Sequence, residues 1–338
     1  MKKIFSLLII FAMVITLCAC GKKEEEKKPK EESTKKEEKV EQVKIIDVNS
    51  ETRPYAVMIN CHNGALPQSG LQDAYIVYEI MVEGGITRMM ALFKDVDVAK
   101  IGSIRSARTQ FLDYVYEHDA IYVHAGGADD AMKRIGNEGI SDVNVDGQYG
   151  MRDTSLDRSW EHLLFTSTDL IKKGANAEGL KTTTDSGNLL SYSAKSIDFS
   201  EYKDVKEANN VSIKYSDYRT SNYKYDSDKK VYLRSMNNTS NKDLVTGKQY
   251  EVKNIIVYGV TYSNYTHNGY SLYQKIDNVG SGEGYYITEG YAIPIIWKKS
   301  SKNAKTVYKV KETGKELVVN DGNTYIQIYP KNEKLNIN

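Results

Sequence analysis

The sequence predicts an α+β fold, in which a mixed α/β domain with layered sheets and helices spans residues 49–195 and a smaller β-rich domain spans residues 205–332. Up to about residue 190, strand-like apolar runs alternate with helix-like segments, which is typical of mixed α/β structure. Farther along the chain, short apolar runs are separated by turns rich in Gly, Asn and Asp, which is typical of β structure. Tyrosine favours strands, and 20 of the 26 tyrosines lie at or after Tyr149.

The first 19 residues have the organisation of a lipoprotein signal peptide. Lys2 and Lys3 precede an apolar run over residues 4–17, which is shorter than the roughly 20 apolar residues that a membrane-spanning helix needs. The run ends in LCAC at 17–20, which resembles the lipobox, where cleavage precedes a cysteine whose sulfur carries diacylglycerol. We therefore expect Cys20 to bear lipid chains such as palmitate and to anchor the chain at the extracytoplasmic face of the cell membrane. The alternative is an uncleaved interfacial helix.

A Lys/Glu-rich segment follows and opens the region that we assign to a disordered tether, residues 20–48. This segment has no apolar face with which to offset the entropy of ordering. The formal net charge of the chain is +1, and removal of Lys2 and Lys3 leaves 44 basic against 45 acidic side chains. A balanced charge gives no field that would attract nucleic acid, so we expect no nucleic-acid partner.

Within the first domain, the chemistry of the chain predicts each element in turn. Residues 54–59 form an apolar run of strand length that opens with proline. Residues 73–81 and 86–93 are two further strands, and the EGG sequence between them predicts a hairpin turn. The apolar spacing after Thr109 predicts a helix that Ser106 or Thr109 caps. The remaining predicted elements are a strand over 120–124, a helix over 129–135, a strand-like run over 160–165 and a helix over 168–173.

The second domain is predicted to consist of short strands. Turn residues separate the apolar runs, and the segments 280–284 and 320–323 are the clearest predicted turns. The tyrosines of this domain suit a half-buried, twisted sheet surface better than an exposed stripe that binds sugars or proteins. The predicted strands lie over residues 211–215, 231–233, 254–258, 285–287, 293–297, 306–310 and 324–329.

Ordered motifs along the chain carry a family resemblance. They are PYAVMIN (54–60), PQSGL (67–71), IVYE (76–79), VEGGITR (82–88), IGSIRSAR (101–108), YVHAGG (122–127), GEGYYI (282–287), AIPI (292–295) and YIQIYP (325–330). The sequence resembles the YerB-like lipoproteins, a family defined by a domain of unknown function with N-terminal and C-terminal parts. The resemblance implies an envelope lipoprotein of Gram-positive type bacteria with a mixed α/β N-terminal part, and it implies no activity. Cys61 and Ser103 depart from the family, which usually has Asn and Pro at these positions.

The candidate binding site is an arginine pair at a predicted helix start. Arg105 and Arg108 precede a helix whose first N–H groups have no partner within the helix, and guanidinium groups match phosphate or carboxylate in shape. We therefore predict an anion site, whose candidate residues are Arg88, Arg105, Ser106, Arg108, Glu79, Glu83 and His124. The two glutamates are candidates to orient the arginines or to act as acid and base, and the histidine ends a strand. The alternative is an internal ion-pair network in which the arginines pair with Glu79, Glu83, Asp95 or Asp113.

Cysteine and histidine give weaker signals. Once the signal is removed and the lipidated cysteine is excluded, Cys61 stands alone, and we expect neither a disulfide nor a cysteine-based metal cluster. Cys61 is predicted to be a small apolar residue, because His62 points to the opposite face of an extended chain. No metal-binding spacing links His62, His124 and His162, so we predict no metal and no cofactor.

These observations predict a membrane-anchored module that binds an anionic or peptide-like component of the cell envelope. The sequence leaves enzymatic activity open and favours its absence, since no pair of nucleophile and base is legible. A cell-wall polymer transferase or hydrolase is the first alternative, and a scaffold for interactions between envelope proteins is the second. The expected partners are therefore the membrane, through the lipid anchor, and a cell-wall component or an envelope protein.

Overall fold

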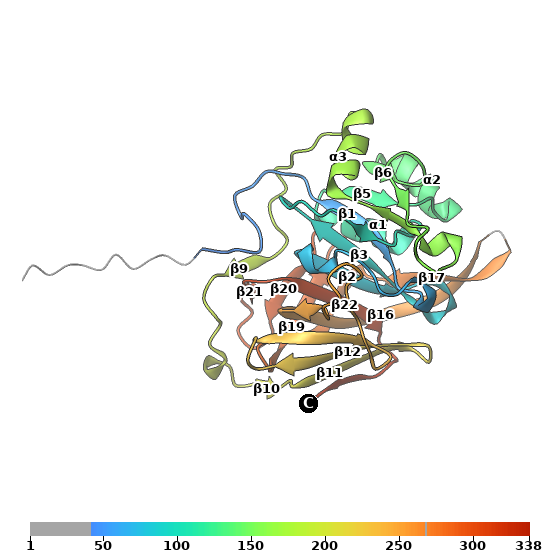
Figure 1. Cartoon of the computed structure of the whole chain (residues 1–338). Helices are drawn as coiled ribbons and strands as arrows, with labels where there is room; N and C mark the ends of the chain where they lie inside the picture. Colours follow the sequence, from blue (N-terminus) through green and yellow to red (C-terminus); the bar gives the residue numbers. More distant parts are fainter. Residues whose placement is uncertain (1–41, 268) are drawn as a thin grey trace, which may run out of the picture. The chain divides into compact units, whose positions relative to one another are not determined.

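The computed structural model describes residues 42–267 and 269–338, and the predicted α+β class is confirmed in this part of the chain (Figure 1). The predicted signal peptide, Cys20 and the tether before residue 42 lie outside the described residues. All described residues belong to one compact unit. Near its start, the backbone N–H groups of Lys44 and Ile45 donate to the Asp321 carboxylate, and Ile46 is buried. The fold therefore begins within the segment that the sequence assigned to the tether.

A large sheet, with twelve strands counted over the described residues, takes strands from both halves of the chain. Its strands are β1 (Tyr55–Asn60), β2 (Ile76–Met81), β3 (Thr87–Phe93), β5 (Ile121–His124), β6 (Asp142–Asn144), β10 (Lys206–Glu207), β16 (Asn254–His267), β17 (Tyr270–Asp277), β18 (Gly280–Thr288), β19 (Tyr291–Lys299), β20 (Val307–Val310) and β22 (Thr324–Pro330). Their order is β10-β19-β18-β16-β22-β2-β3-β1-β5-β6, with β17 paired to β16 and β20 to β19. Because β22 lies parallel to both β2 and β16, a late strand joins the two halves of the chain.

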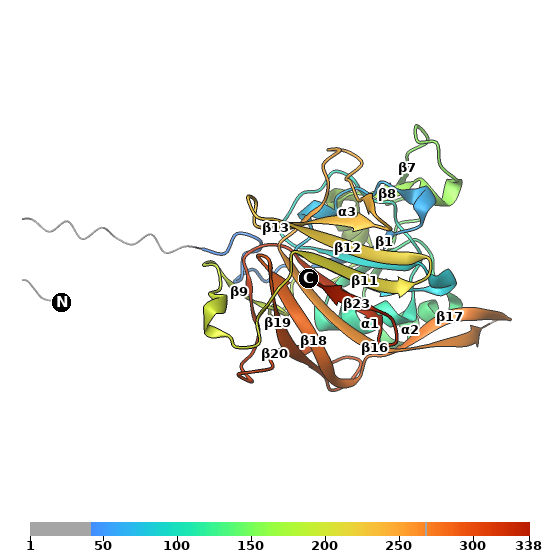
Figure 2. The ribbon, with the colours of Figure 1, turned by 90° about the horizontal axis from the view of Figure 1, so that it is seen from below.

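Smaller sheets complete the β structure. A sheet of six strands, again within the described residues, packs on one face of the large sheet (Figure 2). It consists of β11 (Asn210–Ser216), β12 (Arg219–Asp226), β13 (Val231–Met236), β14 (Thr239–Ser240), β15 (Glu251–Val252) and β23 (Leu335–Ile337). The other strands form a three-stranded sheet of β4 (Ile101–Gly102), β7 (Met151–Arg152) and β8 (Leu164–Thr166), and a pair of β9 (Ser191–Ser193) and β21 (Val318–Asn320).

Helices cover both faces of the large sheet. The α-helices are α1 (Thr109–Glu117), α2 (Asp129–Glu138) and α3 (Thr168–Ala177), and the 3-10 helices are η1 (Asn63–Ala65), η2 (Leu71–Asp73), η3 (Glu83–Gly85), η4 (Trp160–His162) and η5 (Phe199–Glu201). Apolar side chains of α1 and α2 share one core with the large sheet, whereas those of α3 and of the six-stranded sheet share the core on the other face. No helix in the described part is both long enough and apolar enough to cross a membrane.

Tyrosines fill both cores more deeply than the sequence predicted. Tyr78, Tyr114 and Tyr258 are buried in the core under α1, and Tyr215 and Tyr223 are buried between the two large layers of sheet. A buried phenol usually finds a hydrogen-bond partner, and Tyr215 donates to the Glu79 carbonyl oxygen at 3.2 Å. The enrichment in tyrosine therefore serves packing between layers.

The hairpin predicted after residue 73 is confirmed, whereas one predicted turn is wrong. Strands β2 and β3 pair in antiparallel register, and Gly84 and Gly85 in η3 have φ angles of 72° and 70°. The turn predicted at 280–284 belongs to β18 instead. A Cβ atom at Gly282 would lie 2.7 Å from Nε1 of Trp297, so glycine is needed here for close packing and not for a turn.

Two further local predictions differ from the structure. The predicted caps of α1 are wrong, because Arg108 occupies the N-cap position and no side chain caps the helix. The strand-like run predicted over 160–165 is divided, since η4 takes its first half and β8 begins at Leu164. Both differences affect the candidate site, because they change which groups face solvent beside the arginines.

Candidate functional site

The predicted arginine site lies where the parallel strands β1 and β5 end. The segment that leads to α1 runs along both strands: the Arg105 N–H donates to the Met58 carbonyl oxygen (3.0 Å), and the Ala125 N–H donates to the Arg105 carbonyl oxygen (3.1 Å). These hydrogen bonds place Arg105 and the first turn of α1 at the carboxyl edge of the two strands. Ligands of α/β folds commonly bind at this edge.

Glu83 holds two of the three arginines. Arg108 donates from Nε (2.9 Å) and Nη2 to the two Glu83 carboxylate oxygens, and Arg88 Nη2 lies 3.5 Å from Glu83 Oε1. Although burial acts in the opposite direction, the Arg108 hydrogen bond and the charges of both arginines lower the pKa of Glu83 to about 2. Burial and the Arg108 charge lower the pKa of the buried Arg88 to about 9. Glu83 is thus an ionised partner that fixes both guanidinium groups.

Arg105 has a different environment. Its Nη1 donates to the Glu161 carbonyl oxygen at 3.3 Å, and among the residues that the structure describes no carboxylate forms an ion pair with it within 4.0 Å. Burial lowers the pKa of its guanidinium, and the more distant Glu161 carboxylate opposes this shift. We call Arg88, Arg105 and Arg108 the arginine cluster. Among the residues that the structure describes, Glu83 supplies the carboxylate that lies within ion-pair distance of this cluster, so one paired negative charge faces three positive charges.

The first turn of α1 adds N–H donors to the arginine cluster. Because no side chain caps this helix, its first N–H groups point out of the helix and carry partial positive charge. Tyr122 of β5 is fully buried nearby, and its hydroxyl makes no hydrogen bond of acceptable geometry with any described residue. Burial raises the pKa of this hydroxyl, whereas the neighbouring Arg108 N–H and the Arg88 charge act against that shift. The hydroxyl therefore lies beside the same positively charged groups.

His124 supports the loop that borders the arginine cluster. Its Nδ1 lies 2.8 Å from the Gly126 carbonyl oxygen, its Nε2 lies 3.0 Å from Asp142 Oδ2, and its ring packs on Tyr122 with 5.1 Å between centroids. Both ring nitrogens are therefore occupied by partners within the fold. His124 is fully buried, so its role in a binding site would be to position the Gly126 loop and Tyr122.

Glu79 lies on the opposite face of the sheet from the arginine cluster. Side chains alternate along a strand, so the neighbours of Glu79 in β2 face α1 whereas Glu79 faces the six-stranded sheet. There its carboxylate accepts hydrogen bonds from Thr87 (2.7 Å), Ser221 (2.9 Å) and Arg234 (2.9 Å). Glu79 and Arg234 are both fully buried. Glu79 therefore joins the two sheets, and the structure does not bring it to the other candidate residues.

An internal ion-pair network, the alternative that the sequence left open, accounts for two of the three arginines. Glu83 pairs with Arg88 and Arg108, while Asp113 pairs with an arginine of α2 at 2.6 Å. Ser106 contributes its carbonyl oxygen, which accepts from Arg88 Nη1 at 2.6 Å. Arg105 does not belong to this network, so the hypothesis of an anion site remains at Arg105.

Two aromatic residues beside the arginine cluster escaped the sequence analysis. Tyr273 of β17 lies against Arg108, with 5.8 Å between the guanidinium carbon and the ring centroid. Trp160 of η4 is exposed, and the residue after it binds Arg105. Tyr273 has no local signal, because β17 is distant from the arginines in sequence. The run WEHLLF at 160–165 does carry a local signal against a single strand, because it lacks the alternation of apolar and polar residues that a half-buried strand shows.

The three histidines whose spacing was examined for metal binding lie in two separate places. His62 and His162 stack with their ring centroids 4.8 Å apart, whereas His124 is bound to Asp142. Over the described residues, no group of three or more His, Cys, Asp and Glu side chains could hold a metal ion. Cys61 is free and buried, as predicted for a small apolar residue, and burial together with the Glu79 charge raises the pKa of its thiol to about 11.

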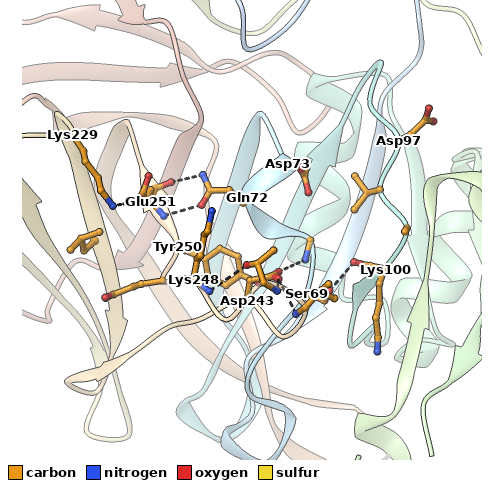
Figure 3. Close-up of a pocket in the computed structure, with 17 residues that line it drawn as sticks. Ser69, Gln72, Asp73, Asp97, Lys100, Lys229, Asp243, Lys248, Tyr250 and Glu251 are labelled. Atoms are coloured by element: carbon orange, nitrogen blue, oxygen red, sulfur yellow. Dashed lines mark hydrogen bonds and ion pairs between the residues drawn. The ribbon is translucent and has the colours of Figure 1, made fainter. Parts of the chain in front are cut away.

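A separate cavity of about 800 Å³ opens between the loops at 69–73 and 97–100 and the segment 243–251 (Figure 3). The central carboxylate of this cavity is bound within the fold: Asp243 accepts from three backbone N–H groups at 2.8–3.0 Å and from the Tyr250 hydroxyl at 3.0 Å. None of the candidate residues from the sequence lines this cavity. Its polar groups mainly connect the two halves of the chain, so we place the candidate site at the arginine cluster.

Comparison with known families gives the relationship of the chain. Residues 43–181 match the N-terminal domain described as "Protein of unknown function (DUF3048)", and residues 211–326 match the C-terminal domain of the same description. The chain belongs to the DUF3048 family. The family description carries no activity, so the chemistry of the site has to be argued from its geometry.

The chain is similar to YerB from Bacillus subtilis in sequence and in structure. The protein described as "Putative lipoprotein YerB" from strain 168 is 32% identical over 289 residues, which cover 83% of this chain and 82% of that relative. The crystal structure of the Bacillus subtilis YerB protein superposes with a TM-score of 0.74 at 30% identity and covers 86% of this chain and 94% of that one. The resemblance to YerB-like lipoproteins is confirmed, and the DUF3048 chain described here shares the YerB fold.

Proposed function

We propose that this DUF3048 protein is an exported lipoprotein, anchored through Cys20 to the outer face of the cell membrane, that binds an anionic component of the envelope through the arginine cluster. The lipobox-like end of the signal and the description of its relative YerB support the anchored location. Guanidinium groups bind phosphate and carboxylate with paired hydrogen bonds, so these are the anions that the cluster favours. A peptide-like ligand would present a carboxylate.

The observation that carries the anion site is the charge balance around Arg105. Arg88 and Arg108 share Glu83, whereas Arg105 is bound to a carbonyl oxygen and has no carboxylate partner within ion-pair distance in the described structure. A half-buried guanidinium without a carboxylate at ion-pair distance is only partly compensated, and a bound anion would offset the remaining cost. The uncapped start of α1 supplies further donors on the same side.

Calorimetric titration of the full-length chain in mild detergent tests this proposal, with polyglycerol phosphate as the probe. We expect R105A to weaken binding about tenfold, because a charge-assisted hydrogen bond is lost. R105K should lose less, since lysine keeps the charge without the paired donors. The matched control is K224A, which removes one exposed positive charge from β12. Equal binding by the wild type, R105A and K224A, or no binding by the wild type, would refute the proposal.

The geometry favours binding over catalysis. Among the described residues around the arginine cluster on its face of the large sheet, no serine, threonine or cysteine forms a hydrogen bond with a side chain that could act as its base. Cys61 is buried, and burial together with the Glu79 charge raises the pKa of its thiol to about 11. Turnover of a labelled lipid-linked precursor that R108A abolishes would instead support the transferase alternative.

The lipid anchor has its own test. The C20A variant should be lost from the membrane fraction while it keeps its affinity for polyglycerol phosphate.

A further inference from the structure

Trp160 is one of two tryptophans in the chain, and its environment differs sharply from that of the other. Its exposed fraction is 63%, whereas that of Trp297 in the core is 5%. Trp160 begins η4 in the loop between β7 and β8. A single exposed aromatic side chain is common on protein surfaces, so exposure alone assigns no role. The contacts around Trp160 are therefore needed to assign it a role.

Hydrogen bonds from two arginine side chains hold the backbone of the turn that carries Trp160. Arg152 Nη1 donates to the Trp160 carbonyl oxygen at 2.9 Å, and Arg105 Nη1 donates to the next carbonyl oxygen, that of Glu161, at 3.3 Å. The third residue of the turn, His162, is buried, and its Nδ1 lies 3.0 Å from a side-chain amide of β1. An exposed side chain on a fixed turn loses less conformational entropy when it binds a ligand.

Arg152 also covers one face of the indole ring. Its guanidinium carbon lies 4.4 Å from the Trp160 ring centroid, and a 2.7 Å ion pair with Asp146 holds Arg152 in place. Because most of the Trp160 side chain is exposed, ring surface that Arg152 does not cover faces solvent. The face of an indole carries negative potential, which attracts the slightly positive C–H groups of a sugar ring.

We propose that Trp160 is a stacking platform for a sugar ring of the same ligand whose anionic group the arginine cluster holds. The inference rests on the proposed function and narrows the ligand to a glycan that carries phosphate or carboxylate. Arg105 is the physical link, because it binds η4 and also lies within electrostatic reach of Arg108 and Glu83. Because Arg105 binds the carbonyl oxygen of the residue after Trp160, a ligand anion at Arg105 would lie beside the turn that carries the indole.

A membrane surface is the competing occupant of this loop. Trp160 and Met151 are exposed apolar side chains, and arginines flank them, as in many membrane-surface segments. Asp153 and Glu161 of the same loop, and Asp146 before β7, carry carboxylates, which a continuous surface of anionic lipid headgroups would face together, whereas a glycan would present its anion at Arg105. In addition, a fixed turn with one covered ring face suits stacking on a flat ring better than insertion among mobile lipids. These features favour the glycan.

The test is calorimetric titration of the full-length chain in mild detergent with three probes: inorganic phosphate, N-acetylglucosamine and N-acetylglucosamine 1-phosphate. The sugar phosphate should bind more tightly than either simpler probe. W160A should lower affinity for the sugar phosphate about fivefold to tenfold and leave affinity for phosphate unchanged. W160F, which keeps an aromatic ring, should retain most of the wild-type affinity for the sugar phosphate. The matched control is Y291A, which removes a partly exposed aromatic ring from β19.

Intrinsic fluorescence gives an independent readout, because W160F leaves Trp297 as the remaining tryptophan. The sugar phosphate should change the emission of the wild type and not that of W160F. If R105A weakens binding of the sugar phosphate while W160A does not change it, the platform is wrong and the anion site stands. If neither phosphate probe binds the wild type, the proposed function itself fails. If W160A reduces binding to phosphatidylglycerol vesicles but not to the sugar phosphate, Trp160 belongs to a membrane surface and the glycan inference is overturned.

Discussion

Replacing Glu79 with glutamine should destabilise the protein by about 3 kcal/mol, because it leaves a buried arginine without its counter-ion. Glu79 of β2 and Arg234 of β13 lie between the two sheets with 2.9 Å between Oε2 and Nη2, and neither side chain is exposed. Thr87 and Ser221 donate to the same carboxylate. Glutamine has nearly the same shape, so E79Q removes the negative charge with little change in packing.

The magnitude follows from what remains around Arg234 in the variant. Removing one partner of a buried ion pair costs about 3–5 kcal/mol, since the other charge stays in a poorly solvating interior. Arg234 keeps hydrogen bonds to the Asn241 side-chain oxygen and to the Ser221 hydroxyl, and the glutamine carbonyl still accepts one bond. These contacts place the expected loss at the lower end of the range.

Equilibrium unfolding of the full-length chain in urea, followed by tryptophan fluorescence, measures this loss. The double variant E79L/R234M removes both charges together and should recover at least half of it, because no unpaired charge remains. The control E178Q changes an exposed glutamate at the end of α3 and should shift stability by less than about 0.5 kcal/mol. If E79Q unfolds within 1 kcal/mol of the wild type, or if the double variant is less stable than E79Q, the ion pair does not join the sheets as argued.

Three further predictions follow from single contacts. The folded-state pKa of Glu83, about 2, lies below its ordinary 4.5, so its contribution of about 3 kcal/mol is complete above pH 4.5 and is lost as the pH falls toward 2. Urea unfolding between pH 6 and pH 2.5 should therefore show the stabilities of the wild type and E83Q converging, and a constant gap would contradict a stabilising role for the ion pairs of Glu83 with Arg88 and Arg108. G284A should destabilise by about 1–3 kcal/mol, because a Cβ atom there would lie 2.5 Å from the Val257 carbonyl oxygen. Its control G136A, in α2, meets nothing within 4 Å and should stabilise by about 0.5–1 kcal/mol, as thermal melting would show. The buried Cys61 thiol, whose pKa burial and the Glu79 charge raise to about 11, should react with a thiol reagent at pH 8 only as the protein unfolds, and rapid labelling of the native chain would disprove its burial.

The arginine cluster could be predicted because its signals are local. Arg105 and Arg108 lie directly before a helix whose spacing the sequence shows, and the structure places that helix at Thr109–Glu117. Arg88 and Glu83 come together because the hairpin that carries them was also predictable. The separation of Glu79 from Arg88 follows from the same hairpin. In its register Arg88 pairs with Ile80, so it shares a face with Ile80 and not with Glu79.

Other features could not be predicted, because contacts between distant segments determine them. The glycines at 280–284 have the composition of a turn, yet they lie in a strand. Glycine is required there because the Trp297 indole and the Val257 carbonyl approach the strand so closely that a Cβ atom would overlap them. Neither neighbour is visible from the local pattern. The same reasoning applies to Tyr273, which reaches Arg108 only once β17 has paired with β16.

The position of β22 shows that both family-matched segments contribute to the structure around the arginine cluster. The N-terminal match ends at residue 181, yet β22 pairs directly with β2, the strand that leads into Glu83. From the C-terminal match, Tyr273 lies against Arg108 and Arg234 holds the carboxylate that β2 presents to the other face. Because β22 pairs with the strand before Glu83, the geometry of the arginine cluster depends on both segments. A ligand bound at Arg105 would therefore stabilise the whole described unit and not its N-terminal half alone.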